Sequence, residues 1–196
     1  MRRPRHIAVA ACVLAVAALA GCSKAPDTAV PRPHAYPRIA LYDTAYRVVE
    51  AAPVRFEANA GAEAECRPGA CDIRYPRYGA TVYVGVAAVS SENGGIAAHI
   101  ENRLQRMALN LEGVPSHHAE VSVPPGCVAR LVIADGPSAT PVQLLYADTV
   151  RCIVASAAAF LHDGTPRGAG AVDSLRPVTD ALAVDLRRLA ATIRPL

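Results

Sequence analysis

The chain has 196 residues, with 20 lysines and arginines against 17 aspartates and glutamates. Three of the positive charges, Arg2, Arg3 and Arg5, lie at the extreme N-terminus, so the other 17 balance the acidic residues. A neutral body without tryptophan gives no basis for a nucleic-acid partner. A chain of this length can bury a substantial core within one domain.

The first 21 residues have the pattern of a secretion signal. The positive start is followed by an apolar run over residues 7–19 and then by Ala20, Gly21 and Cys22. The apolar run is shorter than the roughly 20 residues of a transmembrane helix. Together with Leu19, the last three residues resemble the lipobox of bacterial lipoproteins. We therefore predict a lipoprotein signal peptide over 1–21 and lipidation of Cys22, by palmitate among other acyl chains; the alternative is an ordinary secretory signal with a chance cysteine.

Residues 22–37 are expected to form a lipid-anchored tether, because their four prolines favour extended backbone. Ser23 follows the lipidated cysteine, and by resemblance to lipoprotein sorting a non-acidic residue there does not favour retention in the inner membrane. We expect a protein of the cell envelope, anchored at the periplasmic face of the outer membrane, with a single domain over 38–196.

Four cysteines lie beyond Cys22, and an even number in an oxidising compartment indicates disulfides. Three connectivities are possible. We favour Cys66–Cys71, which closes a short turn-like loop, and Cys127–Cys152, which would join two neighbouring predicted strands. Zinc binding by the same thiols is the alternative, but their spacing supplies one close pair only. We expect no metal and no cofactor.

Short β-type runs separated by turns occupy most of the body. The expected strands are 39–42, 46–49, 54–58, 71–75, 80–86, 118–123, 128–134, 142–147 and 151–160, the last being ambiguous between strand and helix. Residues 59–69 are expected to form a loop.

Two segments have helical periodicity. The first covers 95–111. The second begins with Asp173 or Ser174 as its N-cap, has Pro177 in its first turn, and places Asp180, Asp185 and Arg187 opposite an apolar stripe. The stripe consists of Leu175, Val178, Leu182, Leu186, Leu189 and Ile193. The pattern predicts an α+β fold, a mainly antiparallel sheet with two amphipathic helices packed on one face.

No known catalytic motif occurs in the sequence, so we expect a protein that is not an enzyme. His117 and His118 are adjacent on a predicted strand, where they would point to opposite faces and chelate poorly. Asp148 and Thr149 at a strand end are typical of a turn, with a polar site as the alternative. A pocket joining either histidine to Asp148 would favour an envelope hydrolase.

Tyrosines and arginines gather near prolines in two segments of the chain. They can form a cation–π surface for a partner, or alternatively a packed strand edge. The residues concerned are Tyr36, Arg38, Arg74, Tyr75, Arg77 and Tyr78.

Four blocks of sequence suggest a family. They are PRPHAYPRI at 31–39, IRYPRYGATVY at 73–83, VQLLYADT at 142–149 and DSLRPV at 173–178. In this order they resemble P-K-P-x-G/A-Y-F-R-I, I-x-x-P-x-x-x-A-x-I-Y, V-Q-F-x-L-T-D-S and D-S-L-x-P-V of the gliding-motility lipoprotein GldD family. A similar helix follows the last block and includes Asp185.

The resemblance implies a cell-envelope lipoprotein of Bacteroidota-type bacteria that serves gliding and is linked to type IX secretion. Its partners would be the membrane, through the lipid, and other envelope proteins of that apparatus. The resemblance implies no catalytic residues. The strands and helices also resemble the Mog1/PsbP-like α+β fold. The alternative function is a periplasmic lipoprotein that binds a small ligand or a cell-wall polymer, which a concave apolar pocket would favour.

Overall fold

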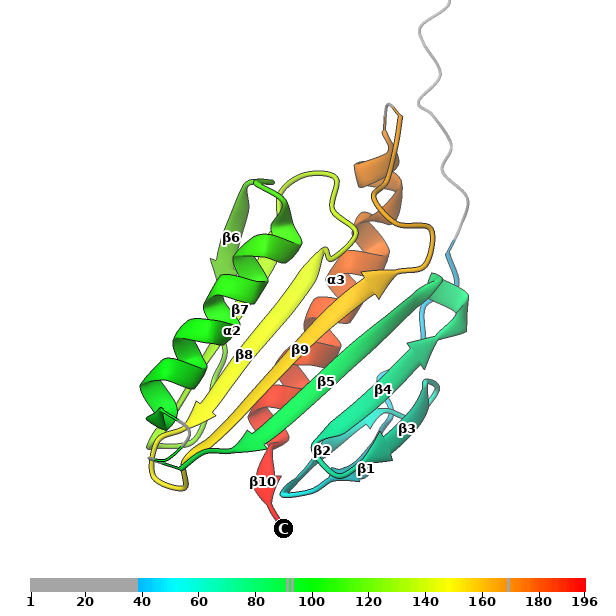
Figure 1. Cartoon of the computed structure of the whole chain (residues 1–196). Coiled ribbons are helices and arrows are strands. Elements are labelled where there is room, and N and C mark those ends of the chain that lie inside the picture. The colour runs from blue at the N-terminus through cyan, green and yellow to red at the C-terminus, as the bar shows by residue number, and fades with distance from the viewer. Residues whose placement is uncertain (1–38, 91, 93, 169) are drawn as a thin grey trace, which may run out of the picture. The chain divides into compact units, whose positions relative to one another are not determined.

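The computed structural model describes residues 39–196 apart from 91, 93 and 169, and these described residues form one compact unit. The predicted signal peptide, Cys22 and the whole of the predicted tether lie outside the described residues. The strands are β1 Tyr46–Ala51, β2 Val54–Asn59, β3 Glu63–Arg67, β4 Ala70–Tyr75, β5 Ala80–Ala88, β6 Ser116–Ala119, β7 Cys127–Ala134, β8 Val142–Asp148, β9 Ile153–Leu161 and β10 Arg194–Pro195. The helices are the 3₁₀ turn η1 Pro76–Tyr78, α2 Gly95–Leu111 and α3 Ala171–Thr192 (Figure 1).

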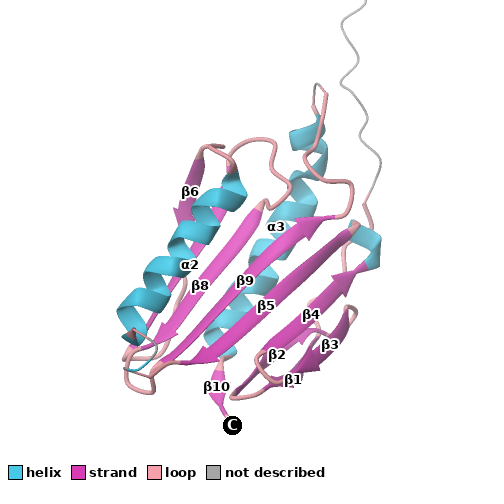
Figure 2. Ribbon diagram, viewed as in Figure 1, coloured by secondary structure: helices cyan, strands magenta, loops and turns pink. Residues whose placement is uncertain are grey.

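The strands form a large sheet and a small one (Figure 2). The large sheet has the order β3-β4-β5-β9-β8-β7-β6, and each neighbouring pair in it is antiparallel. The small sheet has the order β1-β2-β10 and is antiparallel as well. The prediction of an α+β fold with a mainly antiparallel sheet is therefore confirmed.

Helix α3 and strand β2 cover one face of the large sheet, here called the α3 face. Leu144 and Tyr146 of β8 belong to the main core together with Leu182 and Leu186 of α3 and Phe56 of β2. Successive strand residues point to opposite faces, so alternate residues of β8 serve this core. The predicted apolar stripe of the second helix is the surface that packs here.

Helix α2 packs on the opposite face, here called the α2 face (Figure 1). Met107 of α2 joins Leu145 and Ala147 of β8 in a second, smaller core. The expectation that both helices pack on one face is wrong. The physical reason lies in β8, which is buried along its whole length and therefore needs cover on both sides.

Four predicted elements also differ from the structure. Residues 39–42 are not a strand, residues 63–67 are a strand rather than part of a loop, and β6 begins earlier and is shorter than 118–123. Helix α3 has Gly170 as its N-cap rather than Asp173 or Ser174, so Pro177 lies inside the helix. The ambiguous segment 151–160 is strand β9.

Candidate functional site

The predicted Tyr/Arg partner surface is divided between the core and the exterior. Tyr75 and Tyr78 are buried, with 2% and 7% of their surface exposed, so the prediction that they contact a partner is wrong. Arg74 and Arg77 are exposed, and Arg74 forms an ion pair of 2.8 Å with Glu65. Tyr36 and Arg38 lie outside the described residues. The two tyrosines instead fit the alternative interpretation of the sequence, in which they pack at a strand edge.

The rings of Tyr75 and Tyr78 pack against Tyr42, a residue that was not among the candidates from the sequence. The Tyr42 ring lies edge-on against Tyr75 and Tyr78, with centroids 5.7 and 4.9 Å away. The guanidinium of Arg77 lies 4.9 Å from the same ring, and the backbone N–H of Arg77 donates to the Tyr42 hydroxyl at 3.2 Å. This tyrosine cluster (Tyr42, Tyr75 and Tyr78) fixes residues 39–43 to the end of β4, and a cation–π contact does form, but within the fold.

Next to the cluster lies a buried carboxylate that the sequence analysis placed on the exposed side of the last helix. Asp185 is 8% exposed, so that expectation is wrong. Its Oδ1 accepts hydrogen bonds from the Tyr46 hydroxyl at 2.8 Å and from the Asn59 side-chain amide at 3.4 Å. The Asp185 network therefore joins α3 to β1 and β2, and its partners explain how a carboxylate is tolerated there.

Burial and these hydrogen bonds change the pKa values of Asp185 and Tyr46. Burial raises the pKa of Asp185 above its ordinary value, against the opposing effect of hydrogen bonds from Tyr46, Tyr75 and Asn59. Burial, the hydrogen bond to Asp185 and its charge together raise the pKa of Tyr46 to about 12. Both shifts favour the protonated form of the group concerned, and the Asp185 side chain is almost completely buried.

The four candidate disulfide cysteines behave in two ways. Cys66 and Cys71 are bonded to each other across the β3–β4 hairpin. Cys127 and Cys152 are free thiols, so the expected second bridge is absent. Cys127 lies on β7 opposite Asp148, whereas Cys152 precedes β9 and its carbonyl accepts from Val89 N–H, so strand β8 separates the two cysteines.

Asp148 and Thr149 form a turn, which was the favoured interpretation of the sequence. Asp148 Oδ1 accepts from the backbone N–H groups of Val150 and Arg151 at 3.0 and 2.9 Å, and Oδ2 accepts from the Arg151 guanidinium at 3.1 Å. Desolvation alone would raise the pKa of Asp148, but these hydrogen bonds hold it below its ordinary value. The Asp148 carboxylate therefore stabilises the turn that connects β8 and β9.

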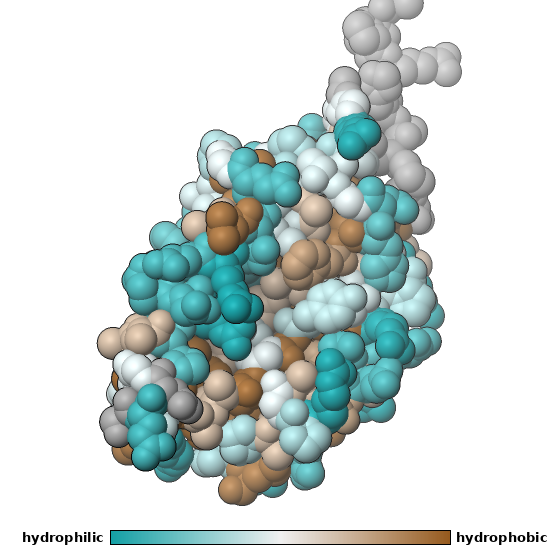
Figure 3. Space-filling model, viewed as in Figure 1, coloured by the Kyte–Doolittle hydropathy of each residue, from teal (hydrophilic) through white to brown (hydrophobic). Residues whose placement is uncertain are grey.

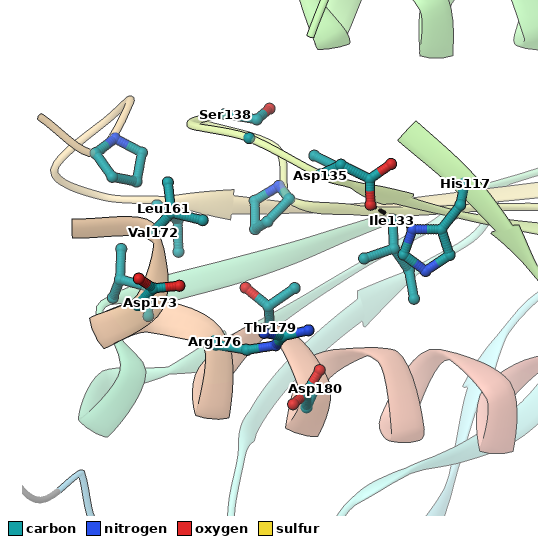
Figure 4. Close-up of a pocket in the computed structure, with 15 residues that line it drawn as sticks. His117, Ile133, Asp135, Ser138, Leu161, Val172, Asp173, Arg176, Thr179 and Asp180 are labelled. Carbon is teal, nitrogen blue, oxygen red and sulfur yellow. Dashed lines mark hydrogen bonds and ion pairs between the residues drawn. The ribbon is translucent and has the colours of Figure 1, made fainter. Parts of the chain in front are cut away.

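A cleft of about 270 Å³, the α3 cleft, lies between the first half of α3 and the β6–β8 end of the large sheet (Figure 4). Apolar side chains such as Ile133, Leu161 and Leu175 line it, with polar groups around them. Its polar lining comprises His117, Asp135, Ser138, Asp173, Arg176, Thr179 and Asp180. The arrangement has the form of a small-molecule site, since a few polar groups surround apolar walls.

The cleft contains a histidine–carboxylate pair but not the one considered from the sequence. His117 Nδ1 lies 2.6 Å from Asp135 Oδ1, and both side chains are about half exposed. Asp148 lies at the other end of β8 from this cleft, roughly 20 Å away along an extended strand. Within the described part of the chain, no hydroxyl or thiol is hydrogen-bonded to His117, although the hydroxyls of Ser138 and Thr179 line the same cleft.

Metal ligands and membrane-spanning helices can be considered for the same described residues. In 39–196, apart from the three omitted positions, there is no group of three His, Cys, Asp or Glu side chains placed to hold a metal ion. Among the helices of that region, none combines the length and apolarity that crossing a membrane requires.

The class of protein is therefore an α+β domain, which in the sequence follows a segment that resembles a lipobox and a proline-rich stretch. A family model described as gliding motility lipoprotein GldD matches residues 26–194. The chain therefore belongs to the GldD family of gliding motility lipoproteins, as the four blocks of sequence indicated. A search of curated proteins finds no match. The family implies a lipoprotein of the cell envelope with a role in gliding motility.

Proposed function

We propose that the protein is a non-enzymatic accessory of the gliding and type IX secretion machinery, anchored by Cys22 at the periplasmic face of the outer membrane. The family match over residues 26–194 carries this proposal. The lipid on Cys22 supplies the anchor, residues 22–37 supply reach, and the folded domain binds other envelope components. Several acyl chains on one cysteine would make the attachment stable.

Two features of the described residues support a non-enzymatic role. The first is the His117–Asp135 pair, to whose imidazole no hydroxyl or thiol of the described residues is hydrogen-bonded. The second is a hydroxyl–imidazole pair, in which Thr81 Oγ1 lies 2.8 Å from His162 Nε2. Thr81 is only 4% exposed, so a substrate has little access to its oxygen.

The test is a clean deletion in the native host, scored for colony spreading and for type IX cargo in the medium. Complementation uses the wild type, Cys22→Ala and the double variant His117→Ala with Asp135→Ala. We expect both phenotypes to fail on deletion, the wild type and the double variant to restore them, and Cys22→Ala to fail. Unchanged spreading and secretion in the deletion strain would reject the proposed role.

The α3 cleft favours a second candidate function, a lipoprotein that binds a small ligand or a segment of cell-wall polymer. Its apolar walls and half-exposed polar groups fit such a ligand. The test is a thermal-shift measurement of the purified lipoprotein with muropeptides and with disaccharide fragments of the cell wall. Binding requires an increase in Tm that is lost in Leu175→Glu, which introduces a charge into the cleft; no increase with any fragment would reject this candidate.

A further inference from the structure

Helix α2 leaves part of its face of the large sheet uncovered. The helix packs on β8 and β9, while the hairpin β3–β4 forms the far side of the same face. Between them lies a groove of about 440 Å³, the β5–β9 groove, whose floor is made by β5 and β9. Figure 3 shows hydrophobic residues in the hollow between two hydrophilic borders.

The floor of the β5–β9 groove is built from small residues. Gly85 lies in the middle of β5, and Ser156 and Ala158 lie beside it on β9. A Cβ added to Gly85 would come no closer than 3.7 Å to a neighbouring side chain, so packing within the fold does not require glycine here. Glycine weakens a strand interior and often occurs where a ligand or another backbone approaches closely. The floor therefore suits an approaching backbone.

An aromatic pair lies at one end of this floor. Tyr83 and Phe160, on neighbouring strands, meet edge to face with ring centroids 5.6 Å apart. Tyr83 is 50% exposed, which makes it one of the exposed large apolar side chains of the domain. Exposed aromatic surface beside a groove is typical of sites that bind an apolar side chain of a partner.

The walls of the groove carry an excess of positive charge. Arg103 and Arg106 of α2 line one wall, and neither has a carboxylate within ion-pair distance among the described residues. On the other wall Arg67 is paired with Asp72 at 3.4 Å. Three arginines and one aspartate leave the lining with a net charge of +2, although the body of the protein is neutral. Burial, and then the neighbouring Arg106, lower the pKa of Arg103.

We propose that the β5–β9 groove binds an extended acidic segment of a partner protein, with carboxylates on Arg103 and Arg106 and an apolar side chain on Tyr83 and Phe160. Arginine guanidiniums bind carboxylates through strong, charge-assisted hydrogen bonds. Arg103 is partly buried and has no carboxylate beside it, which is costly for a charged group, and a carboxylate of the partner would relieve that cost. This inference stands on the groove alone and does not depend on a role in gliding.

The chain's own tether is a poor occupant on charge. The tether and the residue that follows it, Arg38, contain Lys24, Arg32 and Arg38 against Asp27 alone, so this segment is basic. A basic segment is repelled by a lining that is itself positive. Charge complementarity therefore favours a segment from a different protein.

The test uses the full mature lipoprotein in detergent and a short fluorescent peptide that alternates Glu with Phe and Val. Its twins carry Gln or Lys in place of Glu, and a fourth peptide reproduces residues 23–38. Fluorescence anisotropy is measured at low and high NaCl. We expect the Glu peptide to bind at least about tenfold more tightly than the Gln twin, and to bind less tightly at high salt. The Lys twin and the tether peptide should not bind.

Three variants separate charge, shape and folding. The double variant R103Q/R106Q should remove the preference for Glu over Gln. Gly85→Leu should weaken binding of every peptide, because its side chain fills the floor and displaces the Arg103 guanidinium, which lies 3.7 Å from the position that a Cβ would take. Arg130→Gln changes an exposed arginine of β7, outside the groove lining, and should leave binding unchanged. The thermal unfolding of each variant, followed by circular dichroism, is first compared with that of the wild type. Because R103Q/R106Q changes charge and Gly85→Leu adds bulk, loss of binding in both would not come from one shared folding defect.

Several results would overturn the proposal. They are equal binding of the Glu and Gln peptides, binding that survives both groove variants, or no binding by any peptide. Complete displacement of the Glu peptide by inorganic phosphate would assign the groove to phosphate-type anions instead. A monomer–dimer equilibrium that R103Q/R106Q abolishes, measured by sedimentation, would assign it to a second copy of the chain.

Discussion

The hydroxyl of Tyr46 on β1 donates a hydrogen bond of 2.8 Å to the buried carboxylate of Asp185 on α3. The two residues are 139 positions apart, so this bond ties the first strand of the domain to its last helix. Asn59 on β2 donates to the same oxygen at 3.4 Å. The carboxylate therefore holds together the layer of the fold that covers the α3 face.

The Asp185 network should make stability depend on pH. Asp185 has an ordinary pKa of 3.8, and the fold raises it. Between the unfolded and folded pKa values the folded protein binds more protons, so stability falls as pH rises through that window. Asp185→Asn removes this dependence. The free energy of unfolding of the wild type minus that of the variant should grow as the pH is lowered from neutral towards 3.8.

The measurement is urea denaturation of both proteins at several pH values, with Asp180→Asn on the exposed side of α3 as the control. That control should show no such trend. A difference between wild type and Asp185→Asn that stays flat, or that grows with rising pH, would contradict the raised pKa.

The tyrosine cluster should stabilise the start of the domain. Tyr42→Ala removes a ring that packs on Tyr75 and Tyr78, and we expect it to cost about 2–4 kcal/mol. Tyr42→Phe keeps the ring but loses the oxygen that accepts from Arg77 N–H, and should cost about 1 kcal/mol. Urea denaturation gives both values, and Leu41→Ala at a half-exposed neighbouring position should be within about 0.5 kcal/mol of wild type.

Periodicity predicted the elements well where one face alone is buried. Helix α2 was predicted at its observed bounds, because its apolar stripe is regular and turn residues flank it. Strand β8 was also found, but its continuous apolar run does not show which helix covers which face. The side of the sheet that each helix occupies is a property of tertiary packing, which the local pattern does not contain.

The candidate site residues were harder to predict for a related reason. Tyr75 alternates with Arg74 in the sequence, and the pattern cannot distinguish an exposed aromatic edge from a packed one. Asp185 looked solvent-facing because it is charged, yet its burial depends on partners up to 139 residues away. Tyr42 was missed because residues 39–42 were predicted to be a strand. In the structure this segment belongs to neither sheet, and Tyr42 packs on the other two tyrosines of the cluster.

The thiols give a direct test of the disulfide arrangement. In the unreduced native protein, the exposed Cys152 should react fast with a thiol reagent. Cys127 is partly buried and its sulfur accepts from the Tyr146 hydroxyl at 3.0 Å, so it should react slowly until the protein unfolds. Mass spectrometry after timed labelling reads both sites, and a Cys127–Cys152 bridge found by non-reducing peptide mapping would contradict the structure.

Reduction of the Cys66–Cys71 bond should weaken the domain by a limited amount. The bond closes a short loop in the β3–β4 hairpin, and loop-closure entropy gives about 2 kcal/mol for a loop of this size. Urea denaturation of Cys127→Ser/Cys152→Ser with and without reductant isolates this effect. No change on reduction would mean that the hairpin keeps its pairing without the bond.

The contribution of Asp148 to stability should depend on pH in the opposite direction from that of Asp185. Its hydrogen bonds to the β8–β9 turn hold its pKa below 3.8, so its contribution is present above that value and lost as pH falls through the lowered pKa. Asp148→Ala leaves the Val150 and Arg151 N–H groups without this acceptor, and should cost about 1–2 kcal/mol at neutral pH. A variant as stable as the wild type at pH 7, measured by urea denaturation, would show that water replaces the carboxylate without loss.

The two cores on either side of β8 should differ in strength. Leu182 of α3 is completely buried in the larger core, so Leu182→Ala should cost about 3–4 kcal/mol. Met107 of α2 is 7% exposed and belongs to the smaller core, whose helical neighbours are only partly buried, so Met107→Ala should cost about 2 kcal/mol. Urea denaturation measures both, and hydrogen exchange should show α2 opening at lower free energy than α3. Equal costs and equal protection would mean that α2 is held as firmly as α3, and that the β5–β9 groove beside it is a rigid surface rather than one that adjusts to a partner.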